Sequence, residues 1–268
     1  MKKKSILAIT VSVLLILAAV AAGLNAVYTV LSVTTRFSVR SDAGREECRI
    51  LQERLDGYSG KSILFLDLKD ICAEVEKFPC LKVEEVKKNY PRTVELRVSE
   101  RLERYAVERT DAEGKVFYSV LDADGIYLYD REKNENRLDG APNILLNGFG
   151  EMVFAAGERT SGAYVEELLA SVAGFRDGDV NVRLNLVSVT FEKGASDSST
   201  TKFTFRMQEG TRIEVNNLTA LVAEKTEAAF QRYLTLEDED KMFGVVTVND
   251  DKLSGGFNVS YTTLRDLN

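Results

Sequence analysis

The sequence contains no histidine and no tryptophan among its 268 residues. Without an imidazole, the Ser-His-Asp and Cys-His nucleophile arrangements and the histidine-rich zinc sites cannot be built. Most hydrolase mechanisms are excluded, although a pair of carboxylates could still supply an acid and a base. Cysteine is also scarce, since only Cys48, Cys72 and Cys80 are present. Their spacing matches no metal-binding or redox motif, and we expect small buried apolar side chains.

Positive charge is sparse beyond the first residues. The chain has 35 Lys and Arg against 42 Asp and Glu, and three of the cations are Lys2, Lys3 and Lys4. With those three set aside, 32 cations remain against 42 anions, a net charge of −10. A surface that binds nucleic acid needs clustered cations to displace counterions from phosphates. Nucleic acid is therefore not an expected partner, and no cofactor or metal site is expected.

An uncharged run of 31 residues, 5–35, follows the three lysines. About 20 helical residues, each rising about 1.5 Å, cross the apolar core of a bilayer. The run predicts a transmembrane helix over 5–33 after a cytoplasmic tail over 1–4, with Tyr28 near the outer interface and all later residues outside the cytoplasm. A cleaved signal peptide is the alternative, with an apolar region at 6–17 and small residues at 19–21. We favour the anchor because the apolar pattern continues to Val33.

The segment 36–100 reads as strand, helix, helix, strand, strand. A first short strand is expected around Phe37, helices at 45–55 and after an N-cap at Asp67, and strands at 83–89 and 94–98. Pro79 ends the second helix. In the last strand Val94, Leu96 and Val98 alternate with polar residues, which predicts that one face is exposed.

The segment 101–265 is richer in strands. We expect a hairpin of strands 116–121 and 126–129, helices over 163–175 and after Asn217, and strands at 184–191, 202–207, 212–215, 244–248 and 257–262. The helix after Asn217 should turn Leu218, Leu221, Val222 and Ala229 inward. The acidic run 237–240 lacks the spacing of a calcium loop and is expected to be a solvated loop. The fold class is α+β: one transmembrane helix, a small α/β module and a larger mixed domain that ends in strands.

Three motifs stand in a fixed order in the first module: GKSILFLD at 60–67, FP at 78–79 and YPRTVELRVSER at 90–101. Together they resemble the POTRA module of the FtsQ/DivIB family of bacterial cell-division proteins. The motif positions, which we expect to be structural, are Phe65, Asp67, Pro79, Tyr90, Pro91, Thr93, Glu100 and Arg101. The segments 118–125 and 244–250 are similar to parts of the second, β domain of that family. Ser41, Cys80 and Glu103 depart from the residues that are common in the family.

The resemblance implies a non-enzymatic scaffold of the division machinery. It would be a single-pass protein of the inner or cytoplasmic membrane at the division septum. Its partners would be FtsL-like and FtsB/DivIC-like membrane proteins and, through them, the septal penicillin-binding transpeptidase complex. The family engages its partner with the final strands, which here contain Val246, Val248, Phe257, Val259 and Tyr261. These side chains could instead fill the core of the domain.

Two other classes stay open. One is a membrane-anchored or secreted cell-wall hydrolase that uses paired carboxylates, for which Asp122 and Asp124 are candidates although they lie in a turn. The other is a POTRA-type module that handles polypeptides during transport. That class is typically built from several tandem modules, whereas one is visible here.

We expect the anchor to be retained. The intact mass of the protein from the membrane fraction should correspond to a chain that still carries residues 6–28, because the apolar run is longer than a signal peptide requires. A mature N-terminus at or near Gly23 would show cleavage instead.

Overall fold

The computed structural model describes residues 2–150, 152–173, 185–193, 201–251 and 255–263, without side chains for residues 2–10. The chain divides into two compact units, Met1–Arg101 and Leu102–Asn268. Each unit has its own hydrophobic core, and each is described separately below.

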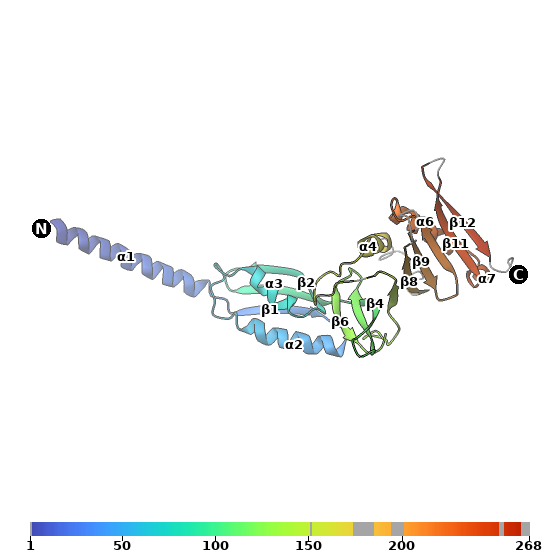
Figure 1. Ribbon diagram of the computed structural model, residues 1–268. Helices are drawn as coiled ribbons and strands as arrows, with labels where there is room; N and C mark the ends of the chain where they lie inside the picture. The colour runs from blue at the N-terminus through green and yellow to red at the C-terminus, as the bar shows by residue number, and fades with distance from the viewer. Residues whose placement is uncertain (1, 151, 174–184, 194–200, 252–254, 264–268) are drawn as a thin grey trace. The chain divides into compact units, whose positions relative to one another are not determined.

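The first unit is a three-stranded sheet with two helices on one face (Figure 1). Its elements are α1 (Lys2–Val27), β1 (Ser32–Ser38), α2 (Asp42–Asp56), α3 (Leu68–Glu76), β2 (Leu81–Asn89) and β3 (Thr93–Glu100). The strand order is β1-β3-β2, with β1 parallel and β2 antiparallel to the central β3. This arrangement confirms the predicted order of strand, helix, helix, strand, strand.

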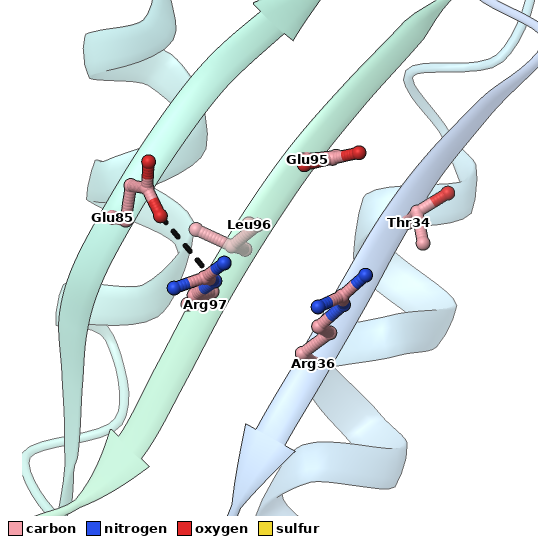
Figure 2. A pocket seen from close by; sticks show the side chains of 6 residues that line it. All are labelled: Thr34, Arg36, Glu85, Glu95, Leu96 and Arg97. Atoms are coloured by element: carbon pink, nitrogen blue, oxygen red, sulfur yellow. Dashed lines mark ion pairs between the residues drawn. The ribbon is translucent and has the colours of Figure 1, made fainter.

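The alternation along β3 separates the two faces of this sheet. Val94, Leu96 and Val98 are buried in a core that also contains side chains of α2 and α3. On the opposite face, which Figure 2 shows, Glu85, Glu95 and Arg97 project from β2 and β3, and Arg97 Nε lies 3.3 Å from Glu85 Oε2. The hollow between these side chains leaves no space for a bound molecule. The predicted assignment of the faces is confirmed.

The uncharged run forms α1, which ends at Val27, six residues before the predicted end. The residues from Ser32 onward belong to β1 instead, because they pair with β3. Over the described residues, no helix has the length and hydropathy of a membrane span.

The second unit is built on one nine-stranded sheet. Its strands are β4 (Glu103–Thr110), β5 (Val116–Asp122), β6 (Tyr127–Arg131), β7 (Ile144–Asn147), β8 (Leu186–Glu192), β9 (Lys202–Met207), β10 (Arg212–Asn216), β11 (Gly244–Asp250) and β12 (Phe257–Thr263). They lie in the order β12-β11-β10-β9-β8-β7-β4-β5-β6. The described helices of this unit are α4 (Val165–Ala173), α6 (Val222–Leu234) and the short α7 (Asp238–Lys241).

Helices α4 and α6 contribute the apolar side chains that cover the core of this sheet. Val165, Leu168 and Leu169 of α4 are buried, and residues 174–175 of the predicted helix lie outside the described part of the chain. In α6, Ala229 is buried, but Leu221 is 43% exposed. Leu221 precedes the helix with φ +54°, so the helical period does not reach it.

Three elements differ from the sequence-based expectation. The acidic run expected as a loop forms α7. Strands β4 and β7 were not predicted, because β4 is rich in charge and β7 has four residues.

The charged residue that opens β4, Glu103, is buried. Its carboxylate accepts hydrogen bonds from Arg137 Nε at 3.0 Å and from the Tyr129 hydroxyl. The pKa of Tyr129 is raised. The larger cause is burial of its hydroxyl, and the second is the hydrogen bond to Glu103.

The three cysteines are free, and two of them are buried as expected. Cys48 and Cys80 are buried, and Cys72 is half-buried. Burial raises the pKa of the Cys48 thiol to about 11. Because the thiolate is the reactive form, Cys48 is inert at neutral pH.

We expect Leu96→Asp to unfold the first unit, because an uncompensated charge in a core costs several kcal/mol, comparable to the stability of a small domain. Arg97→Ala, on the exposed face of the same strand, should cost less than about 1 kcal/mol. Thermal unfolding combined with hydrogen exchange of the β3 amides measures both. Equal losses in the two variants would contradict the assignment of the faces.

Candidate partner-binding edge

The large sheet has two edge strands, β6 and β12, and they differ in what lies beside them. The start of β6 is covered by a neighbouring segment. Tyr127 N–H donates to Glu158 O at 2.9 Å, and Gly157 N–H donates to Tyr127 O at 2.9 Å. Beyond β12, the described part of the chain places no further strand. β12 is therefore the last strand of this sheet among the described residues.

β12 is paired with β11 without interruption. Seven residue pairs join the strands, from Gly244 opposite Thr263 to Asp250 opposite Phe257, with no bulge. Phe257, Val259 and Tyr261 are half-buried and pack against the core. The residues between them, Asn258, Ser260 and Thr262, are exposed. The strand thus has one face on the core and one face in solvent.

The backbone of β12 can be oriented from the hydrogen bond beside its turn. In an antiparallel ladder, hydrogen-bonded and non-hydrogen-bonded residue pairs alternate. Asp251 N–H donates to Gly256 O at 2.9 Å, so Asp251 and Gly256 form a hydrogen-bonded pair. Because the two types alternate along such a ladder, the N–H groups of Asn258 and Ser260 point toward β11. Those of Phe257 and Val259 point away from β11. The outer row of peptide groups therefore belongs to the residues whose side chains face the core.

The predicted partner-binding residues fall into two groups. Val246 and Val248 of β11 are fully buried, so their side chains lie in the core and cannot touch a partner. Phe257, Val259 and Tyr261 lie on the edge strand itself. The Tyr261 hydroxyl donates to Asp240 O at 3.0 Å and thereby ties β12 to α7. Its ring packs so closely over Gly244 that a side chain at that position would overlap it.

A buried lysine holds the end of this hairpin. Lys225 of α6 is fully buried, and its ammonium group lies 2.5 Å from Asp250 Oδ1 and 2.7 Å from Asn217 O. The hydrogen bond from Lys225 lowers the pKa of the Asp250 carboxyl. The role of Lys225 was not predicted from the sequence. Lys225 lies four residues before Ala229, at the spacing of the apolar face of the helix, and this position could have indicated that the lysine is buried.

Most POTRA motif residues have structural positions. Asp67 caps α3 by accepting from Lys69 N–H at 2.9 Å. Pro79 follows the end of α3, and Pro91 lies in the turn between β2 and β3, one residue after Tyr90. Thr93 begins β3. Phe65 and Tyr90 differ from the others because their side chains are exposed.

Glu100, at the end of β3, closes the corner between β1 and α2. Its carboxylate accepts from the N–H groups of Arg40 at 2.8 Å and Ser41 at 3.0 Å, and from the Ser41 hydroxyl. The Ser41 side chain in turn caps α2 by accepting from Gly44 N–H at 2.9 Å. Arg101 follows, and its N–H donates to Cys80 O at 2.7 Å. Glu100 therefore joins three elements of the module.

Of the two candidate carboxylates of a hydrolase, that of Asp122 holds a turn. Asp122 Oδ1 accepts from the N–H groups of Asp124 at 2.8 Å and Ile126 at 2.9 Å. Asp122 ends β5 and is buried, and its hydrogen bonds shape the chain reversal that leads to β6. This arrangement gives Asp122 a role in the fold.

The first unit is similar to a known family of domains. Residues 49–101 match the POTRA domain of the FtsQ type. The match runs from within α2 to the end of β3 and includes the three motifs, so the first unit contains a POTRA domain. The match covers this module alone, and its FtsQ type agrees with the resemblance to the FtsQ/DivIB family of bacterial cell-division proteins. No curated protein matches the chain significantly.

We expect Lys225→Met to loosen the β11–β12 hairpin. The variant deprives two carbonyls and one carboxylate of a donor, at a cost on the order of 1–3 kcal/mol for each buried group left without one. Lys202→Met is the matched control, because Lys202 pairs with the exposed Glu192 and should cost less than about 1 kcal/mol. Denaturant unfolding and hydrogen exchange of β12 measure the difference.

The same pair gives a dependence on pH. Because the pKa of Asp250 is lowered in the folded state, the stabilisation is complete above the unfolded pKa of about 3.9 and is lost as the pH falls through the lower folded value. Lys225→Met should lack this component of acid destabilisation. Identical acid unfolding of the variant and the parent would contradict the role of the pair.

Proposed function

We propose that the protein is a non-enzymatic scaffold of the bacterial division machinery that binds its partner by adding a strand to β12. An FtsQ-type POTRA domain fits a cell-division scaffold. The observation that carries the binding mode is the open edge of β12, at the end of a nine-stranded sheet. An edge strand offers N–H and C=O groups that extend a sheet with an incoming chain, and this needs no catalytic residue.

The edges of the molecule are not equally suited to pairing. Proteins protect exposed edges with charges, prolines, bulges or covering segments. β6 has a covering segment, and β2 has a bulge between Val83 and Glu85 as well as several lysines. β1 carries Arg36. β12, with the sequence FNVSYTT, has neither a charge nor a proline, and its register is unbroken. This makes β12 the edge most open to a partner.

The partner segment should be an extended chain with alternating apolar side chains. Added beside β12, it would place every second side chain next to Phe257 and Val259 on the core face of the sheet. We propose that this segment belongs to the extracytoplasmic part of an FtsL-like or FtsB/DivIC-like membrane protein. Through these proteins the scaffold would be linked to the septal penicillin-binding transpeptidase complex.

We further propose that α1 anchors the chain in the cell membrane, with the N-terminus in the cytoplasm. The apolar side chains of its described part are exposed, with Leu14, Leu15, Ile16 and Leu17 all more than half exposed. Such a surface on a helix is stable in lipid and unfavourable in water. Lys2, Lys3 and Lys4 favour retention of the N-terminus on the cytoplasmic side. The two units would then lie outside the cytoplasm, at the division septum.

Val259→Pro tests the binding mode. Proline removes the N–H that points away from β11 and leaves the ladder with β11 intact, so the domain should stay folded while the partner is lost. Val259→Ala shortens the side chain and keeps the N–H, so partner recovery should be largely retained. Co-purification of FtsL-like and FtsB/DivIC-like proteins from membranes, together with a mid-cell ring of tagged protein, measures the effect. Normal recovery with folded Val259→Pro would exclude docking at this edge.

A further inference from the structure

The end of the first unit that adjoins α1 collects segments that are distant in the sequence. β3 runs parallel to β1, so the turn before β3 lies where β1 begins. The loop between α2 and α3 is bonded to the residues after α1. Val30 N–H donates to Lys61 O at 2.8 Å, Gly60 N–H to Val30 O at 2.9 Å, and Ile63 N–H to Tyr28 O at 2.7 Å. Residues 28–31, 57–65 and 87–92 together form what we call the α1-proximal end.

The turn between β2 and β3 is bonded to the last residues of α1. The Arg92 guanidinium donates to the carbonyl oxygens of Ala26 and Val27, each at 3.0 Å. The rings of Tyr28 and Tyr90 lie edge to face, with centroids 6.2 Å apart. The α1-proximal end is therefore fixed to the C-terminal turn of α1 itself.

This end exposes large apolar side chains. Phe65 is 88% exposed, Leu31 60%, Tyr90 59% and Leu64 42%. The neighbouring Ile63 and Leu66 are buried in the core, whereas Leu64 and Phe65 between them are exposed. Four such residues on adjoining segments exceed the scattered apolar residues of an ordinary surface.

The same segments are basic although the chain as a whole is acidic. Residues 57–65 and 87–92 contain Lys61, Lys87, Lys88 and Arg92 and no carboxylate. Lys87 is paired with Glu95 at 3.2 Å, and the Lys61 ammonium group lies 3.9 Å from the centre of the Tyr58 ring. Exposed aromatic and aliphatic side chains beside cations are typical of a surface that enters the headgroup region of an anionic bilayer.

We propose that the α1-proximal end is a lipid-binding surface, on which Leu31, Leu64, Phe65 and Tyr90 enter the outer leaflet and Lys61 and Lys88 contact phosphates. The proposal rests on the membrane anchoring proposed for α1. The 26 residues of α1 span about 39 Å, against about 30 Å for the hydrocarbon core and 40–45 Å with the headgroups. The residues after Val27 then lie among the headgroups.

The exposed residues are within reach of that layer. Thr29 pairs with Ser62, and Phe65, three residues further on, lies at most about 11 Å from Ser62. The continuity with an apolar helix favours lipid over a protein partner as the occupant, because the surface begins where that helix ends. Binding at this surface would fix how the POTRA domain lies on the membrane, whereas a single helix alone would leave it free to tilt.

The absence of tryptophan provides a clean test. Full-length Phe65→Trp, Phe37→Trp and Leu15→Trp each carry one fluorophore, and they are placed in vesicles of phosphatidylcholine and phosphatidylglycerol with or without bromine on the upper acyl chain. Phe37 is the matched control. It lies on β1, 37% exposed, six residues beyond Leu31 and so about 20 Å further from the membrane. Leu15→Trp reports insertion of α1.

We expect quenching and a blue shift for Phe65→Trp and Leu15→Trp, and neither for Phe37→Trp. If Phe65→Trp stays as bright as Phe37→Trp while Leu15→Trp is quenched, the lipid-binding surface is wrong and the anchor stands. If Leu15→Trp is not quenched, the anchor fails, and this proposal fails with it.

A second arm tests the cations. In the Phe65→Trp background, Lys61→Glu with Lys88→Glu should reduce quenching in vesicles that contain phosphatidylglycerol, and added salt should narrow the difference. Lys77→Glu with Lys82→Glu is the control, because these lysines lie at the opposite end of α3 and β2. Equal quenching in the two double variants would show that Lys61 and Lys88 do not contribute to lipid binding.

Discussion

An open sheet must end in two edges, and in the second unit this constraint decides where another chain can bind. A strand at an edge has one row of peptide groups with no adjacent strand. At β6 that row meets the residues around Glu158, whereas β12 ends the described sheet. The ion pair of the buried Lys225 with Asp250 holds the hairpin that presents β12. Helix α6 thus connects the core of the second unit to its outermost strand, β12.

Carboxylates carry much of the local structure in this acidic chain. Glu100 closes the corner between β1 and α2, Glu103 meets Arg137 and Tyr129, and Asp122 shapes the turn after β5. Each of these groups accepts several hydrogen bonds from fixed donors, which is how a folded protein accommodates a charge away from water. The surplus of acids therefore reflects turns and corners as well as a solvated surface.

The sequence was a good guide wherever one face of an element is apolar. The alternation along β3 and the N-cap at Asp67 are found as predicted, since both depend on neighbouring residues alone. The prediction failed at β4, where Glu103 is buried by partners about 30 residues away, and at Leu221, where the backbone leaves the helical conformation. At the candidate site, β11 and β12 were predicted as strands, but their pairing was not. The role of Lys225 was not predicted, because it depends on the burial of its side chain. The outward direction of the Val259 N–H was not predicted either, because it depends on which residue pairs of the ladder are hydrogen-bonded.

The unbroken register of β11 and β12 also has a mechanical meaning. A load applied along β12 acts on all seven pairs together, so they resist in shear and must give way at once. A load applied across the strand would open the pairs one after another, as a zipper opens. A chain added to β12 would inherit this directional strength. Tension along the strand would then pass into the sheet without separating the two chains, while peeling from one end would release them.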